Sequence, residues 1–178
     1  MVGVYMNAYS GFAGVYDLLM DDFDYPRWAD YYVELVRRAG GNPKRMAECG
    51  CGTGSMWQGM CLPDGCRLTL TGFSAGMLDT ARANTAHLQA DYALVDAQDI
   101  PYPDAAFDVV IANMMLYHVP DIVKALREIR RVLKPGGTFI ASGIIEGRQD
   151  EVRAAIEKNG FTVIKHFNED DWHCFVSI

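Results

Sequence analysis

The sequence lacks an excess of positive charge. Lysine and arginine number 16 against 23 aspartate and glutamate residues, which gives a formal net charge of −7. A protein that grips nucleic acid through its phosphates usually has a basic face, so no nucleic-acid partner is expected. The densest basic group lies at one end of a predicted helix, where cations suit the helix dipole, and is expected to form a solvated helix face. Its members are Arg127, Arg130, Arg131 and Lys134.

Long apolar runs and metal-binding patterns are also missing. The most apolar segment, Val109 to Val119, contains Asn113 and His118 and is too short to span a bilayer. No basic stretch followed by an apolar one marks a secretory signal at the start of the chain. The five cysteines have no zinc-site spacing, so free thiols and no metal are expected. These absences predict a soluble, cytoplasmic protein without a membrane partner.

What is present is a single domain of 178 residues, of which half are hydrophobic and 22% are charged. Residues 1–40 are expected to form an N-terminal helical lid or substrate segment, with a helix over Arg27–Ala39 that ends at Gly40. The following strands are predicted: Arg45–Glu48, Arg67–Thr71, Tyr92–Val95, Phe107–Ala112, Thr138–Ser142, Phe161–Phe167 and Trp172–Ile178. The predicted helices are Ser55–Met60, Ser74–Ala86, Pro120–Leu133 and Gln149–Asn159.

This alternation predicts an α/β fold, a Rossmann-like doubly wound sheet of seven strands. Strands that alternate with helices form a mostly parallel sheet covered on both faces. The last two strands follow each other closely and are expected to form a hairpin, which adds one antiparallel strand.

A glycine loop follows the first predicted strand and precedes a helix, as nucleotide-binding loops do. It reads Glu48-Cys49-Gly50-Cys51-Gly52-Thr53-Gly54. The G-x-G-x-G spacing, with an acid two residues before the first glycine, favours S-adenosylmethionine over NAD. No Lys-Ser/Thr pair follows the glycines, which excludes a P-loop.

With this loop, three further motifs occur in order: Val95 to Pro101, Phe107-Asp108-Val109-Val110 and Leu133-Lys134-Pro135-Gly136-Gly137. Together they resemble the class I S-adenosylmethionine-dependent methyltransferases over nearly the whole chain. The N-terminal part of the chain, through the glycine loop, resembles small bacterial enzymes with small-molecule substrates. The tail, from Ser142-Gly143-Ile144-Ile145-Glu146 through Gly160-Phe161 to the Trp172 strand, resembles ribosomal-protein methyltransferases.

The resemblance implies a role for several residues. The loop residues Gly50, Cys51, Gly52 and Gly54 would pass under the methionine part of the cofactor, and Glu48 would help to hold that end. Asp96 would accept a hydrogen bond from the adenine amino group, and the Ala97 amide would complete recognition of the ring edge. Asn113 and Met114 would line the floor near the sulfonium, and Phe73 would lie against the adenine. From the residues alone, Phe73 is as well explained as a core residue, Asp96 also suits a turn or cap, and Asp108 suits strand entry better than ligand binding.

One position departs from the family pattern. Similar proteins carry an acid at the end of the second strand, where it takes both ribose hydroxyls, but here that position is Gly72. Hydrogen bonds to a charged acceptor are worth about 1.5–3 kcal/mol each. The loss of such a pair would weaken cofactor binding by roughly 10- to 1,000-fold.

The catalytic residues are less specified than the cofactor site. The sulfonium is already a good electrophile, so orientation supplies most of the rate, and a base is needed only for a protonated acceptor. His118 follows the fourth strand and is the candidate base, although it also suits helix entry or packing. Tyr9 and Tyr16 are candidates to close over the cofactor, or to serve only as lid or core aromatics.

These observations predict methyl transfer from S-adenosylmethionine to a small molecule by direct displacement, at the carboxyl ends of the first and fourth strands. The alternative is a weak or inactive methyltransferase-fold protein that acts as a binding or interaction module, as Gly72 suggests. A nicotinamide dehydrogenase comes third. The methyl acceptor and the oligomeric state stay open.

Overall fold

A computed structural model describes Tyr31, Glu34 and residues 42–178. The strands are β1 (Arg45–Cys49), β2 (Arg67–Gly72), β3 (Ala90–Leu94), β4 (Phe107–Asn113), β5 (Leu133–Ile145), β6 (Val163–Glu169) and β7 (Trp172–Ser177). The helices are η1 (Ser55–Trp57), α4 (Ala75–Asn84), η2 (Leu116–His118), α5 (Ile122–Val132) and α6 (Gln149–Lys158), and η1 and η2 are single 3-10 turns.

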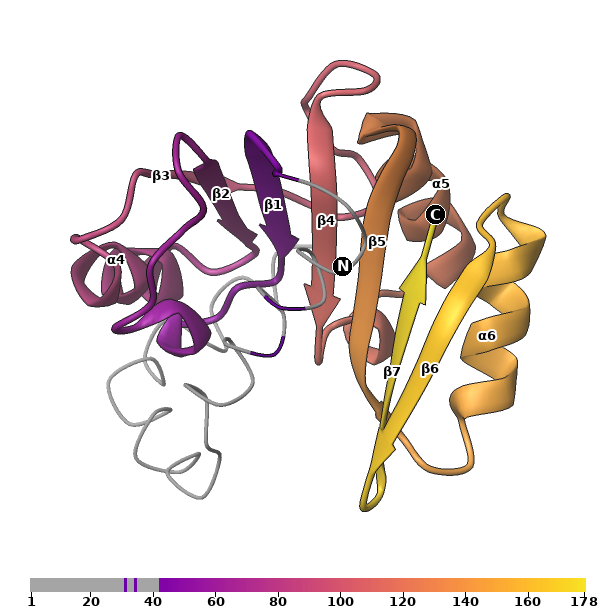
Figure 1. Cartoon of the computed structure of the whole chain (residues 1–178). Coiled ribbons are helices and arrows are strands. Elements are labelled where there is room, and N and C mark those ends of the chain that lie inside the picture. Colours follow the sequence, from indigo (N-terminus) through magenta and orange to yellow (C-terminus); the bar gives the residue numbers. More distant parts are fainter. Residues whose placement is uncertain (1–30, 32–33, 35–41) are drawn as a thin grey trace.

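All seven strands form one sheet in the order β3-β2-β1-β4-β5-β7-β6 (Figure 1). The first five strands pair in parallel, and β7 is antiparallel to both β5 and β6. The predicted Rossmann-like sheet and its C-terminal hairpin are therefore confirmed. The strand order reverses between β1 and β4, which makes this the switch point where such sheets bind ligands.

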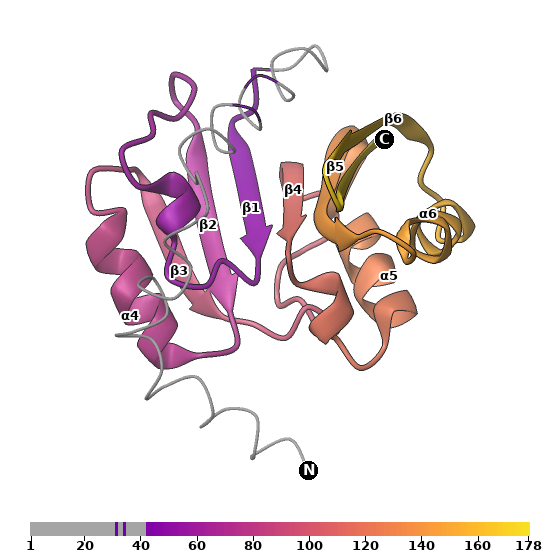
Figure 2. The same cartoon turned by 90° about the horizontal axis from the view of Figure 1, so that it is seen from below.

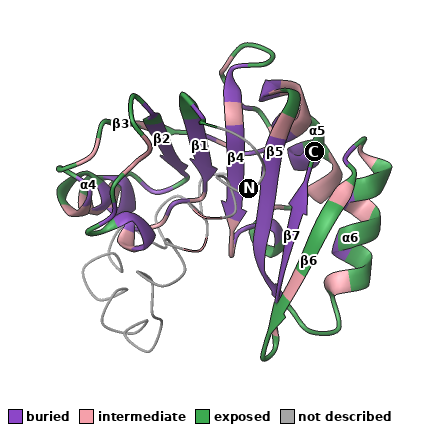
Figure 3. Cartoon of the chain, in the orientation of Figure 1, coloured by how far each residue is buried: buried purple, intermediate pink, exposed green. Residues whose placement is uncertain are grey.

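Two apolar layers cover the sheet, because successive side chains of a strand point to opposite faces. One layer joins Met46, Leu70 and Ile111 to η1 and α4. The other joins Val110 and Phe139 to α5 and α6. Figure 2 shows α4 beside β2 and β3, with α5 and α6 on the opposite side near β5 and β6. The central strands are buried along most of their length, whereas β6 at the sheet edge is largely exposed (Figure 3).

Helices α4 and α5 begin where short polar side chains cap them. Ser74 Oγ accepts a hydrogen bond from the Met77 amide, and Asp121 Oδ1 accepts one from the Lys124 amide. The predicted Ser55–Met60 helix shrinks to the single turn η1. The fifth strand is longer than predicted, because β5 takes in the whole Leu133–Gly137 turn.

Part of the prediction falls on residues that the structure does not describe. Tyr31 and Glu34 are helical, but the rest of the predicted Arg27–Ala39 helix and of the 1–40 segment lies outside the described residues. Within the described part, no helix is both long and apolar enough to cross a membrane.

The basic group is only partly the solvated helix face that was predicted. Arg127 is exposed, but Arg131 is half-buried and forms ion pairs with Glu128 and Asp104. Lys134 pairs with Asp108 at 2.5 Å. Acidic side chains on α5, on the loop before β4 and on β4 itself pair with Arg131 and Lys134, so these two cations interact with more than the helix dipole.

Candidate functional site

The carboxyl ends of β1, β2, β3 and β4 meet at one edge of the sheet, because these strands are parallel. This is the lower edge in Figure 1, toward which the arrowheads of β1 and β4 point. The predicted cofactor residues within the described part all lie at this edge or in the segments directly after it. Four segments that are far apart in the sequence therefore contribute to one site.

The glycine loop adopts backbone conformations that favour glycine. Gly50, Gly52 and Gly54 have φ angles of 70°, 56° and 70°. A Cβ on Gly54 would lie 3.2 Å from the Ala81 Cα, so the loop packs directly against α4. A Cβ on Gly52, by contrast, would meet no atom of the described residues within 4 Å. The backbone at Gly52 is therefore open on that side, as a loop that approaches a cofactor must be.

Glu48 lies two residues before Gly50 on β1, and its side chain is buried. Its carboxylate Oε2 accepts a hydrogen bond of 2.6 Å from the indole Nε1 of Trp57, which follows the loop on η1. Glu48 is 2% exposed and Trp57 is completely buried. Burial raises the pKa of Glu48 from its ordinary value near 4.5 to about 7, and the indole hydrogen bond opposes this rise.

Gly72, at the end of β2, leaves room for a side chain. Its φ angle is not in the left-handed region, and among the described residues a Cβ there would meet only Leu78, at 3.9 Å, which is ordinary contact. Neither backbone conformation nor crowding therefore accounts for glycine at this position. The next residue, Phe73, is 42% exposed at the site edge, which is inconsistent with a plain core role and leaves its ring accessible to a ligand.

Asp96 and Ala97 follow β3 directly. The Asp96 carboxylate accepts hydrogen bonds from the backbone amide of Gln98 at 2.8 Å and from its Nε2 at 3.1 Å. Asp96 therefore has the turn role that the sequence left open, and its orientation is fixed by Gln98. Ala97 is buried.

The segment after β3 is irregular, but α5 holds it in place. Arg131 donates to the carbonyls of Ile100 at 2.7 Å and Tyr102 at 2.8 Å, and the Ile100 amide donates to Glu128 at 3.0 Å. Near the start of α5, the Asp121 amide donates to Gln98 Oε1. Helix α5 thus fixes the loop that carries Asp96.

Asn113 and Met114 lie where β4 ends. Asn113 Nδ2 is 3.7 Å from the Met56 sulfur, which joins the end of β4 to η1. Met114 has a φ of 51°, and its side chain packs on Gly143, because a Cβ on that glycine would lie 2.3 Å from Met114 Cγ. His118 lies further along on η2, exposed and with its ring 4.2 Å from that of Tyr117. His118 therefore lies outside the buried core and is open to solvent.

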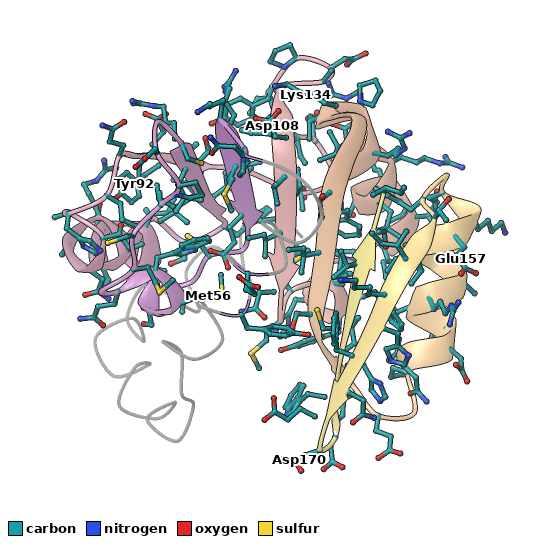
Figure 4. All side chains as sticks on the ribbon, viewed as in Figure 1. Met56, Tyr92, Asp108, Lys134, Glu157 and Asp170 are labelled. Atoms are coloured by element: carbon teal, nitrogen blue, oxygen red, sulfur yellow. The ribbon has the colours of Figure 1, made fainter. Side chains whose placement is uncertain are left out.

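Asp108 lies at the opposite edge of the sheet, together with Lys134 (Figure 4). Its carboxylate accepts from the amides of Lys44 and Arg45 and from Lys134 Nζ, which is the predicted strand-entry role. Met56 lies near the other edge in the same view. Tyr9 and Tyr16 lie outside the described residues.

Two residues of the site were missed from the sequence. Trp57 was assigned only to a predicted helix, and nothing in its spacing indicated a bond to Glu48. Gln98 lies within the Val95–Pro101 motif, for which the resemblance implies a role only for Asp96 and Ala97. An amide two residues after an aspartate is a known turn pattern and could have revealed the contact.

Comparisons with known proteins identify the family of this chain. The sequence pattern of a family described as "Methyltransferase domain" matches residues 47–141. A malonyl-[acyl-carrier protein] O-methyltransferase of Erwinia pyrifoliae is 36% identical over 142 residues, which cover 72% of this chain and 52% of the relative. A ribosomal protein L11 methyltransferase of Desulforapulum autotrophicum is 40% identical over 76 residues, which cover 43% and 24% of the two chains.

The fold is also found among solved structures. The N-methyltransferase NodS of Bradyrhizobium japonicum, crystallised with S-adenosyl-L-homocysteine, superposes with a TM-score of 0.71 at 18% identity, covering 89% of this chain and 88% of NodS. The chain spans about half the length of the curated relatives that it matches.

Proposed function

We propose that this chain, which belongs to the class I S-adenosylmethionine-dependent methyltransferase family, transfers a methyl group from that cofactor to a small-molecule acceptor by direct displacement. The observation that carries the proposal is the meeting of the open Gly52 backbone, Asp96 and Asn113 at one edge of the sheet. The glycine loop offers a surface that a cofactor can approach, and the ends of β3 and β4 lie on the same side.

The residues of the chain would bind and orient rather than react. When bound, the cofactor supplies a methyl group on a positively charged sulfur, which is a strong electrophile. Glu48 would hold the methionine end, and Asp96 with the Ala97 amide would hold the adenine. Holding donor and acceptor in line supplies most of the rate in such a displacement. His118, exposed on η2, would take the proton of an acceptor that needs a base.

Binding of the demethylated product, S-adenosylhomocysteine, tests the cofactor site. Calorimetry is expected to detect binding, and Gly72→Asp is expected to strengthen it about ten-fold or more, because the new carboxylate could accept the ribose hydroxyls. A Cβ at this position would be at ordinary contact distance from Leu78. Gly76→Asp, on the partly exposed surface of α4, is the matched control for the added charge. If neither the wild type nor Gly72→Asp binds at millimolar ligand, the chain does not use this cofactor.

A small-molecule acceptor is supported by the net charge of −7, which disfavours nucleic acid. With a radiolabelled methyl donor, label is expected in a cell-extract fraction below about 1 kDa. Transfer to ribosomal protein instead would contradict this part of the proposal and favour the acceptor named for the Desulforapulum relative.

Gly72 favours a second candidate, a methyltransferase-fold protein that binds a ligand without transferring a methyl group. The acid that the resemblance implies is absent although a Cβ at Gly72 would not collide with the described residues, which supports a weakened ribose contact. In this case S-adenosylhomocysteine binding would persist, or be restored by Gly72→Asp, while no label would be transferred to any fraction.

A further inference from the structure

In the described part of the chain, one oxygen of the Glu48 carboxyl group accepts a hydrogen bond and the other accepts none. Trp57 Nε1 donates to Oε2 at 2.6 Å, and among residues 42–178 no donor is bonded to the other oxygen, Oε1. A carboxylate can accept about four hydrogen bonds, so most of its capacity is unused. A buried carboxylate with a single donor is poorly compensated, which calls for an explanation.

The surroundings of Glu48 contain no compensating charge on the neighbouring strands. Its register partners are Leu70 on β2 and Ile111 on β4, both completely buried. Its titratable neighbours, Cys49 and Cys51, stay neutral near pH 7, because burial raises the pKa of both thiols well above the ordinary value. Among the described residues, the indole N–H of Trp57 is thus the polar group that stabilises the charged form of the Glu48 carboxylate.

We infer that Trp57 is a positioning residue of the cofactor site, whose indole N–H holds Oε2 of Glu48 and leaves Oε1 to accept from the ammonium group at the methionine end of the cofactor. This inference rests on the proposed function. Trp57 acts through Glu48 and does not itself touch the cofactor. Its place on η1, directly after the glycine loop, fixes the carboxylate relative to the backbone that the cofactor approaches.

A pH dependence of binding follows from this geometry. Only the ionised carboxylate attracts the ammonium group, so the cofactor and a proton compete for Glu48. Since the pKa of Glu48 is about 7, affinity is expected to fall as the pH drops through 7. Removing the indole donor would raise the pKa further, and the midpoint of the binding profile would move up by about one pH unit.

The experiment is calorimetry of S-adenosylhomocysteine binding between pH 5.5 and 8.5 for the wild type, Trp57→Phe, Glu48→Gln and the double variant. Trp57→Phe keeps an aromatic ring but removes the donor. It is expected to bind about five-fold more weakly at pH 7 and nearly normally at pH 8.5. Glu48→Gln should flatten the profile, and Trp57→Phe should have no further effect in that background. The cofactor's own amino group titrates equally in all four proteins.

Phe139→Leu is the matched control for a general loss of packing. Phe139 is completely buried in the other apolar layer, so this variant should lose stability without moving the pH midpoint. An indole N–H signal of Trp57 that titrates near pH 7 in the wild type, and not in Glu48→Gln, gives a second reading by nuclear magnetic resonance that needs no change at Trp57.

The failures can be told apart. A wild type that binds no S-adenosylhomocysteine at any pH overturns the proposed function. If the wild type binds but Trp57→Phe leaves the midpoint unchanged, or weakens binding equally with and without Glu48, the positioning role is wrong and the proposed function stands. An indole signal that does not titrate also overturns the positioning role.

Discussion

The buried Glu48 carboxyl group is expected to make the folded chain less stable as the pH rises, and Glu48→Gln should remove this effect. In the unfolded chain the group loses its proton near pH 4.5, but in the folded chain it keeps the proton up to about pH 7. Between these values the folded state binds more protons than the unfolded state, so stability falls with rising pH. A rise of this size in the pKa lowers the free energy of unfolding by about 3 kcal/mol between acidic pH and pH 8.

Urea unfolding of the wild type and Glu48→Gln at pH 5 and pH 8 measures the effect. Glutamine keeps the shape and can still accept from the Trp57 indole, but it carries no charge. The variant's stability relative to the wild type should therefore increase by about 2–3 kcal/mol between the two pH values. Shifted groups elsewhere, such as Asp108 and His166, are common to both proteins and cancel in the difference.

The result that refutes this reasoning is a pair of parallel stability curves. Equal pH dependence in the two proteins would mean that Glu48 titrates near its ordinary value. Its burial between Leu70 and Ile111 would then not govern its charge. A gap of the opposite sign, with the wild type gaining stability toward pH 8, would mean that a cation compensates the carboxylate in the folded chain.

Two matched pairs test the scaffold of the site by urea unfolding. Gly54→Ala should lower the free energy of unfolding by about 2–3 kcal/mol, because it combines a left-handed φ with a collision against Ala81. Gly52→Ala should lower it by only about 1 kcal/mol, from backbone strain alone. Equal losses in the two variants would contradict the packing of the loop on α4. Arg131→Ala should lower the free energy of unfolding by about 2 kcal/mol, because it leaves two carbonyls of the loop after β3 without their donor. Arg127→Ala, on the exposed side of α5, should lower it by under about 0.5 kcal/mol. If both arginine variants behave alike, α5 does not hold that loop.

Much of the fold could be predicted because its signals are local. The position of β4 follows from a short apolar run, and those of α4 and α5 from polar caps before apolar stripes. The connection after β1 was harder to predict, since the segment from Ser55 combines helix formers with Gly59. This glycine adopts a φ of 79° and stops the helix after one turn.

The site was predicted less completely, because its chemistry depends on contacts between distant residues. The motifs and their order along the chain identify Glu48 and Asp96 by position, but they do not reveal the hydrogen-bond partners of the two carboxylates. The bond from Trp57 to Glu48 requires the glycine loop to turn back over β1, and the bond from Arg131 to Ile100 joins residues 31 positions apart in the sequence. Neither contact has a sequence spacing that a periodic pattern would reveal.

Packing and burial explain neither the glycine at position 72 nor the acid at position 48, and both positions concern the same proposed cofactor. At Gly72 an acid is absent although a Cβ there would not collide with the described residues, so crowding at the Cβ does not explain the glycine. At Glu48 an acid is present where apolar neighbours and burial disfavour its charge, so folding alone does not explain its presence. A residue that destabilises the folded chain at neutral pH is better explained by what it binds. The buried carboxylate is therefore a stronger reason than the glycine loop to expect a cationic ligand at this edge of the sheet.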